Sequence, residues 1–277
     1  MISSGVYTSY QQANKSSNQQ KMKILQHFDR SNTASHVLYR LKKGEWAQFI
    51  AELPEAYRKC YITDKALDEL SKERKISKSE FLEKYILPDE PIIKSGDFGE
   101  ILCFHAVIEN FENKGFVLFA PRKWRWKDSR NKAAPGADAI LFHVANPKKP
   151  TKKDILVTIE SKMKAVKSKE HRIQDAIDGA TTDKLTRMAK TLSWLEEKYA
   201  KHGVEDKRQL VERFKDPASF GDYKKLFKAI AIMDTNFEAD ETGKAINNIQ
   251  GVAVIVFSIE ELKKAYEDTR TNILKSV

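Results

Sequence analysis

Short apolar runs separated by turn residues follow one another from residue 116 onward, and they constrain the fold more than any other feature of this 277-residue chain. They are rich in Val, Ile, Leu and Phe, a composition typical of strands. The predicted strands, the first three of them in a meander, span residues 116–120, 137–144, 155–159, 226–233 and 251–258. Helical patterns alternate with them at 97–113, 168–201 and 260–274. This order predicts an α/β sandwich, with a mixed sheet flanked by helices.

The residues before this region follow a different pattern. Residues 1–20 are rich in Ser, Gln and Asn, which predicts a flexible tail. Apolar residues recur at helical spacing between 21 and 90, and prolines at 88 and 91 end the pattern. We therefore expect a helical extension at 21–90 and a separate α/β domain at 91–277.

Composition excludes several classes of protein. No apolar run approaches the roughly 20 residues that cross a bilayer, so we expect no membrane partner. The N-terminus lacks the basic and apolar regions of a signal peptide, which indicates a cytoplasmic protein. Cys60 and Cys103 lack zinc-like spacing and are expected to be buried free thiols.

The positive charge of the chain is concentrated in one region. Residues 121–172 hold 15 Lys and Arg against 5 Asp and Glu, whereas the rest of the chain holds 34 of each. The whole net charge of +10 therefore lies in this stretch. Such a concentration indicates a polyphosphate partner such as DNA.

The same stretch carries an acidic constellation. Asp138 begins one predicted strand, and Glu160-Ser161-Lys162 ends the next. Two carboxylates on neighbouring strands can hold a hard cation, Mg²⁺ or Mn²⁺, and the Ser161 backbone carbonyl could add a ligand. Lys162 shares a strand face with Glu160 and would stand beside the attacking water and the phosphate. The arrangement predicts a metal-dependent nuclease.

Each of these residues also has a simpler interpretation. Asp138 could only cap a turn, and Glu160 with Lys162 could form a surface ion pair of little energetic value. Glu100 leads an apolar helical stripe, which favours a metal-binding or catalytic role, although it could serve the helix dipole. We favour the catalytic role for Glu100 because Asp97 already provides a negative charge near the expected helix start.

A basic segment interleaved with tryptophan precedes Asp138. Bases can stack on the indole rings while the cations meet phosphates, although both tryptophans could equally be core residues. The candidate DNA-binding residues are Arg122, Lys123, Trp124, Arg125, Trp126, Lys127, Lys164 and Lys167.

Three motifs in this order resemble the PD-(D/E)xK nuclease superfamily, and more narrowly the HamA family of the bacterial Hachiman antiphage system. They are Gly96-Asp97-Phe98-Gly99-Glu100, Pro135-Gly136-Ala137-Asp138 and Thr158-Ile159-Glu160-Ser161-Lys162. The resemblance implies a restriction-endonuclease-like fold and a nuclease domain at 91–277. It also implies metal and catalytic roles for Asp138, Glu160 and Lys162, and the helical acidic position for Glu100. The Gly-Ala between Pro135 and Asp138 departs from the usual Pro-Asp.

The resemblance further implies a helicase partner resembling HamB, with which the nuclease would act on DNA during phage infection. The sequence has no phosphate-binding loop, so an ATP-driven motor would be another chain. Residues Trp46, Phe49 and Tyr57 could form the docking surface, or could cover the sheet. Two alternatives remain open: a stand-alone restriction or repair endonuclease, and a catalytically inactive DNA-binding module.

Overall fold

The computed structural model describes residues 22–215 and 223–277. The tail expected at residues 1–20 lies outside this part of the chain.

One mixed sheet of six strands runs through the described residues, in the order β1-β2-β6-β5-β4-β3. The strands are β1 (Phe28–Asn32), β2 (Val37–Leu41), β3 (Ala139–His143), β4 (Ile155–Lys164), β5 (Lys224–Asp234) and β6 (Val252–Ile259). The pairs β1–β2 and β3–β4 are antiparallel, and the three central pairs are parallel. The predicted α/β fold with a mixed sheet flanked by helices is confirmed.

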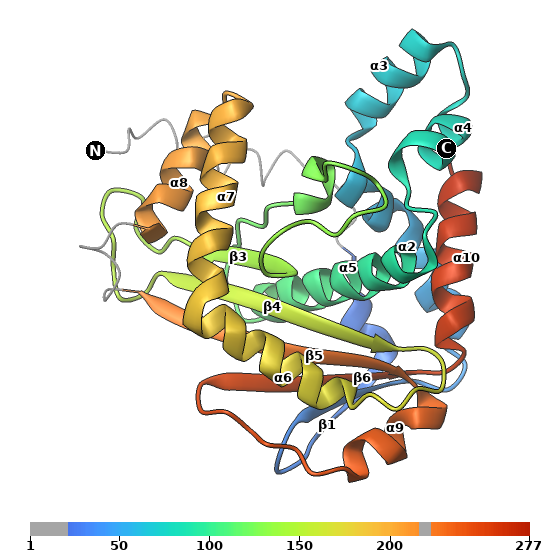
Figure 1. Ribbon diagram of the computed structural model, residues 1–277, viewed down its shortest axis with the longest axis vertical. Coiled ribbons are helices and arrows are strands. Elements are labelled where there is room, and N and C mark those ends of the chain that lie inside the picture. Colours follow the sequence, from blue (N-terminus) through green and yellow to red (C-terminus); the bar gives the residue numbers. More distant parts are fainter. Residues whose placement is uncertain (1–21, 216–222) are drawn as a thin grey trace.

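Helices cover both faces of this sheet (Figure 1). The α-helices are α2 (Trp46–Tyr61), α3 (Asp64–Arg74), α4 (Lys78–Phe81), α5 (Pro91–Glu112), α6 (Arg172–Thr182), α7 (Met188–Lys201), α8 (Glu205–Lys215), α9 (Thr235–Gly243) and α10 (Leu262–Lys275). Two 3₁₀ turns, η1 (Ile24–His27) and η3 (Lys123–Trp126), and two π-helical turns, η2 (Leu82–Ile86) and η4 (Asp183–Arg187), complete the elements used below.

The two faces of β4 have different partners because side chains alternate along a strand. Ile155, Val157 and Ile159 belong to the main core, together with α5, α2 and α10. On the other face of the sheet, Leu156 packs with residues of α7 and α8, and α6 packs across β4, β5 and β6. Glu160 and Lys162 share this face with Leu156 and therefore lie on the α6 side of the sheet.

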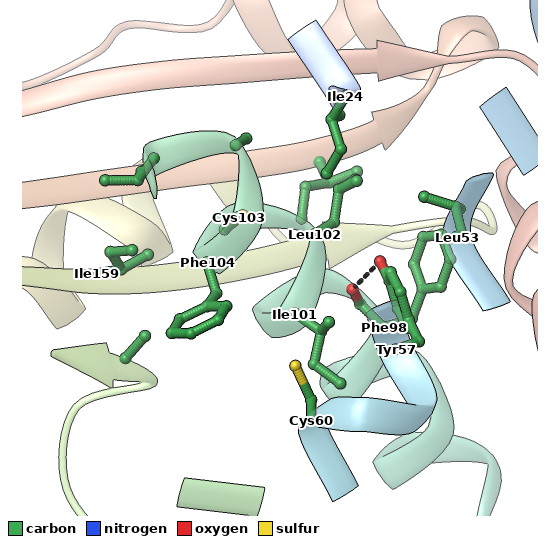
Figure 2. Packing of buried hydrophobic residues seen from close by; sticks show 14 of the residues in the cluster. Ile24, Leu53, Tyr57, Cys60, Phe98, Ile101, Leu102, Cys103, Phe104 and Ile159 are labelled. Carbon is green, nitrogen blue, oxygen red and sulfur yellow. Dashed lines mark hydrogen bonds between the residues drawn. The ribbon is translucent and has the colours of Figure 1, made fainter. Parts of the chain in front are cut away.

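Helix α5 is the centre of the main core (Figure 2). Its residues Ile101, Leu102 and Phe104 are completely buried against β4 and α2. Gly99 makes the close approach to the sheet possible, because a Cβ atom there would lie 3.0 Å from Ile232 Cδ1. This packing fixes the position of the next residue, Glu100.

The region expected to be entirely helical between 21 and 90 contains two strands, so that prediction is wrong for β1 and β2. They form an antiparallel pair, and β2 adds to the central strand β6 in parallel. Phe49 and Tyr57 of α2 are buried in the same core as α5. They cover the sheet, which corrects their suggested role as exposed docking residues.

Three other details differ from the sequence expectations. Residues 116–120 make only an isolated bridge, Phe119 to Phe142, instead of a strand, so the expected meander is a hairpin. Helix α5 begins at Pro91 rather than near 97. The expected helical region at 168–201 starts at Arg172 and is interrupted by η4, and α8 and α9 were not anticipated.

Two further expectations concern the cysteines and membrane-spanning segments. Cys60 and Cys103 are buried free thiols, as predicted. No helix among the described residues is both long and apolar enough to span a membrane.

Candidate active site

Asp138 and Glu160 lie opposite each other at the end of the β3–β4 hairpin. The register pairs Ala139 with Ile159, and one further antiparallel step brings Asp138 opposite Glu160. The Asp138 carboxylate accepts hydrogen bonds from the Ser161 amide (2.7 Å) and from the Ser161 hydroxyl (3.2 Å). Since a backbone N–H donates in the plane of a sheet, this carboxylate continues the ladder where β3 ends.

The turn before Asp138 is held by buried partners on both sides. Gly136 has φ +87°, a conformation that favours glycine, and a Cβ atom there would lie 2.4 Å from Thr191 Oγ1. The amide of Ala137 donates to that hydroxyl over 2.9 Å. From the other side, the ammonium of Lys123 donates to the carbonyl oxygens of Ala134 and Ala137. These contacts fix where the chain enters β3.

The Glu160 side chain is only 2% exposed, and its carboxylate contacts two positively charged side chains. Lys162 Nζ lies 2.5 Å from Oε1, and the Arg187 guanidinium contacts Oε2. Arg187 also donates to the Gly179 carbonyl (2.9 Å) and pairs with Asp183. The α6 backbone approaches closely enough that a Cβ atom on Gly179 would lie 2.4 Å from Glu160 Oε1.

Glu100 lies on the opposite side of the sheet from Glu160, because α5 covers the other face. The indole N–H of Trp124 donates to its carboxylate over 3.0 Å. Burial, followed by the nearby charge of Asp138, raises the pKa of Glu100 to about 8. Glu100 is therefore largely protonated at neutral pH.

Asp138 links the carboxylates of the two faces electrostatically. Burial and then the charge of Asp138 raise the pKa of Glu160 above its ordinary value. Burial also raises the pKa of Asp183 to about 6. Burial alone lowers the pKa of Lys162, but the Glu160 carboxylate outweighs it and leaves that pKa raised. Three buried carboxyl groups of the site therefore have raised pKa values, a situation common at functional sites.

The structure brings Asp138, Glu160 and Lys162 together, as the motifs predicted, with Glu100 beyond Asp138. Within residues 22–215 and 223–277, no group of three His, Cys, Asp or Glu side chains is arranged to hold a metal ion. Glu160 is instead neutralised by protein cations. Burial and then the charge of Asp138 raise the pKa values of both Glu100 and Glu160, and a positive charge beside Asp138 would oppose the second of these effects.

The basic segment before Asp138 faces largely inward. Lys123 and Trp124 are buried, and Lys127 forms a buried ion pair with Asp97 (2.7 Å). The guanidinium of Arg125 donates to the Lys59 carbonyl. The expectation that these side chains are free to meet phosphates and bases does not hold for this conformation, because the protein already occupies them. Asp97 is likewise no helix-dipole residue, since it lies in the second turn of α5.

Three further DNA-binding candidates differ in exposure. The ring of Trp126 packs edge-on against Tyr199 with centroids 4.9 Å apart. Lys164 is buried and pairs with Glu241 over 2.7 Å. Trp126 and Lys164 are therefore engaged in contacts within the protein. Lys167 is exposed, and its role in DNA binding stays a prediction.

Sequence reasoning missed the residues that surround Glu160 from outside the motifs. Arg187 and Asp183 are four residues apart on η4, a spacing common to ordinary surface pairs on helices. Gly179 looks like any helical glycine. Nothing local to 179–187 indicates that Glu160 is their neighbour, because α6 and η4 reach it only through the packing of α6 on the sheet.

Comparison with known proteins adds one family. The HamA family model matches residues 15–274, which is nearly the whole chain. The match includes all three motif regions and both strands of the hairpin. No curated protein matches the chain.

Proposed function

Because this chain belongs to the HamA family, we propose that it is a metal-dependent DNA nuclease of a Hachiman antiphage defence complex. The observation that supports this proposal most is the juxtaposition of Asp138 and Glu160 across β3 and β4, with Lys162 on the Glu160 face. Neither structural alternative fits well. Glu160 is too buried for a surface ion pair, and Asp138 accepts hydrogen bonds from the neighbouring strand instead of capping its own turn.

In this proposal Asp138 and Glu160 hold Mg²⁺ or Mn²⁺, with the Ser161 carbonyl as a further ligand. When bound, such an ion lowers the pKa of a water and stabilises charge on the phosphate. Before the ion can bind, the Glu160 carboxylate has to exchange at least one of its contacts with Lys162 and Arg187. Removing a partner from a buried charge costs about 3–5 kcal/mol, so a positive replacement is required.

Lys162 supplies a fixed positive charge to the reaction. Its side chain is 33% exposed, so it can reach a phosphodiester from the site while its stem stays on the sheet. The raised pKa keeps the ammonium protonated at neutral pH, which suits stabilisation of the developing negative charge on the phosphate.

Glu100 has a different place in the proposal. It lies beyond Asp138 and is held by Trp124, with a pKa of about 8. A cation at Asp138 would lower that pKa and favour the ionised form, so Glu100 would complete the negative charge of the site only once the ion is bound.

The nuclease acts with a partner in this proposal. The family association with Hachiman defence supports a complex, and a helicase subunit resembling HamB is the partner proposed. The chain has no phosphate-binding loop of its own. Opening of duplex DNA by that partner would deliver single strands to the site.

A plasmid-nicking assay tests the proposed activity. Supercoiled DNA is incubated with purified protein and Mg²⁺ or Mn²⁺, with and without EDTA and with and without the neighbouring helicase. We expect nicked or linear products that disappear in EDTA. Intact plasmid in every metal-containing reaction, with and without helicase, would favour the inactive DNA-binding alternative.

A further inference from the structure

A hollow lies directly behind the Asp138 turn, on the α6 side of the sheet. Its volume is about 300 Å³, at the lower end of the range for small-molecule sites. It is lined by Pro135, Gly136, Thr182, Thr186, Arg187, Lys190 and Trp194. One wall is therefore the turn that positions Asp138, and the other is η4 with the first turns of α7.

We propose that this hollow is a nucleotide subsite, in which Arg187 and Lys190 hold a phosphate of a single DNA strand and Trp194 stacks on a base. This subsite rests on the nuclease function proposed above. It would position the DNA strand beside the candidate active site.

The spacing of the three side chains supports this assignment. Arg187, Lys190 and Trp194 are separated by three and four residues, so they share one face at the start of α7. That face lines the hollow. Cations combined with an aromatic ring on one surface are the usual chemistry of single-strand binding.

Charge complementarity favours a phosphate as occupant. Lys190 is exposed, and no ion pair to it is present among residues 22–215 and 223–277. Lys198 lies nearby, with its ammonium 5.4 Å from the Trp194 ring centroid and 3.4 Å from the Asp128 carboxylate, which partly neutralises it. The hydroxyls of Thr182 and Thr186, which donate to the carbonyl oxygens of Asp178 and Thr182, line the rest of the hollow.

Arg187 connects the hollow to the candidate active site. Its guanidinium contacts Glu160 while its side chain lines the hollow. A phosphate bound at Lys190 would compete with Glu160 for this guanidinium. Substrate binding would then help to free the Glu160 carboxylate for a metal ion, without any change in the rest of the fold.

The test measures binding in EDTA, so that no cleavage is needed. A fluorescein-labelled oligodeoxythymidine is titrated with full-length wild type, with Lys190→Glu, and with Lys263→Glu as a matched charge reversal. Lys263 is exposed on α10. Helix α10 lies on the opposite side of the molecule from α7 in Figure 1. We expect Lys190→Glu to weaken binding about tenfold or more, and Lys263→Glu to leave it nearly unchanged.

The salt dependence gives a second readout. Loss of one phosphate contact should reduce the slope of log affinity against log salt by about 0.7 for a single strand. Trp194→Ala should weaken binding about fivefold or more, whereas Trp194→Phe should retain most of it. Equal affinities and slopes for the Lys190 and Lys263 variants, or no binding by wild type, would overturn the subsite. Lys190-dependent binding by a protein that never cuts plasmid would reject the nuclease proposal and keep the subsite.

Discussion

The fold constrains the Glu160 side chain on every side. It emerges from a central strand, is nearly inaccessible, and meets the α6 backbone at Gly179. Its two cationic partners come from β4 and η4. Any side chain at 179 would have to displace the carboxylate, because the closest atoms are those of Glu160 itself.

We predict that Gly179→Ala sharply reduces DNA cleavage without gaining the stability that alanine usually adds to a helix. Gly96→Ala on α5 is the matched control, since nothing lies within 4 Å of a Cβ atom there. The control should keep wild-type cleavage and gain up to about 1 kcal/mol of unfolding free energy. Cleavage rates and denaturant melts measure both effects; full cleavage by Gly179→Ala would show that the Glu160 position is not needed.

His105 on α5 gives a prediction about pH. Burial, followed by the charge of Arg122, lowers its pKa to about 3. The unfolded chain takes up this proton near pH 6.5, whereas the folded chain stays neutral, so stability falls as pH falls below that value. Between about pH 7.5 and about pH 5.5 this group should cost about 1.4 kcal/mol of unfolding free energy.

The measurement compares urea melts of wild type and His105→Gln at both pH values. The variant lacks the titrating ring, so its loss on acidification should be smaller by that amount whatever its stability at neutral pH. Identical losses in the two proteins would mean that His105 becomes protonated in the folded state.

At the scale of elements, α7 supports the site from behind. Thr191 is completely buried, accepts from the Ala137 amide and donates to the Arg187 carbonyl. One hydroxyl thus ties the Asp138 turn to the element that carries Arg187. The ammonium of Lys123 connects the same turn to η3, because it donates to the Ala137 carbonyl oxygen.

We predict that Thr191→Val lowers the free energy of unfolding by about 1–3 kcal/mol, because the buried Ala137 amide loses its acceptor. Cleavage should fall as well, since the Asp138 turn loosens. Thr191→Ser keeps the hydroxyl and should retain most of both properties. Thermal melts and initial cleavage rates test this; equal behaviour of the Val and Ser variants would contradict a positioning role for the hydroxyl.

The β3–β4 hairpin and its three motif residues could be predicted from sequence because the necessary information is local. The apolar runs mark the strands, and the two-residue period puts Glu160 and Lys162 on one face. Strands β1 and β2 escaped prediction because β2 depends on β6, more than 200 residues away in sequence. The direction of Lys123 and Trp124 also escaped prediction, because their partners lie outside η3: Ala137 in the turn before β3, and Glu100 on α5.

At the scale of the whole molecule, the proposed nuclease acts together with a helicase partner. We predict that the neighbouring helicase and this chain form a complex when they are co-expressed, and that the helicase changes the cleavage rate. Size-exclusion chromatography at micromolar concentration measures the association. Separate elution, together with a cleavage rate that the helicase does not change, would favour a stand-alone endonuclease.

The most direct test of the central claim compares cleavage by purified Glu160→Ala and Lys162→Ala with cleavage by wild type in Mg²⁺. Glu197→Ala and Lys153→Ala, both at exposed positions, are the matched controls. We predict that the two site variants fold but lose cleavage, while the controls cut like wild type. Undiminished cleavage by both folded site variants would contradict the assignment of the active site to the β3–β4 hairpin.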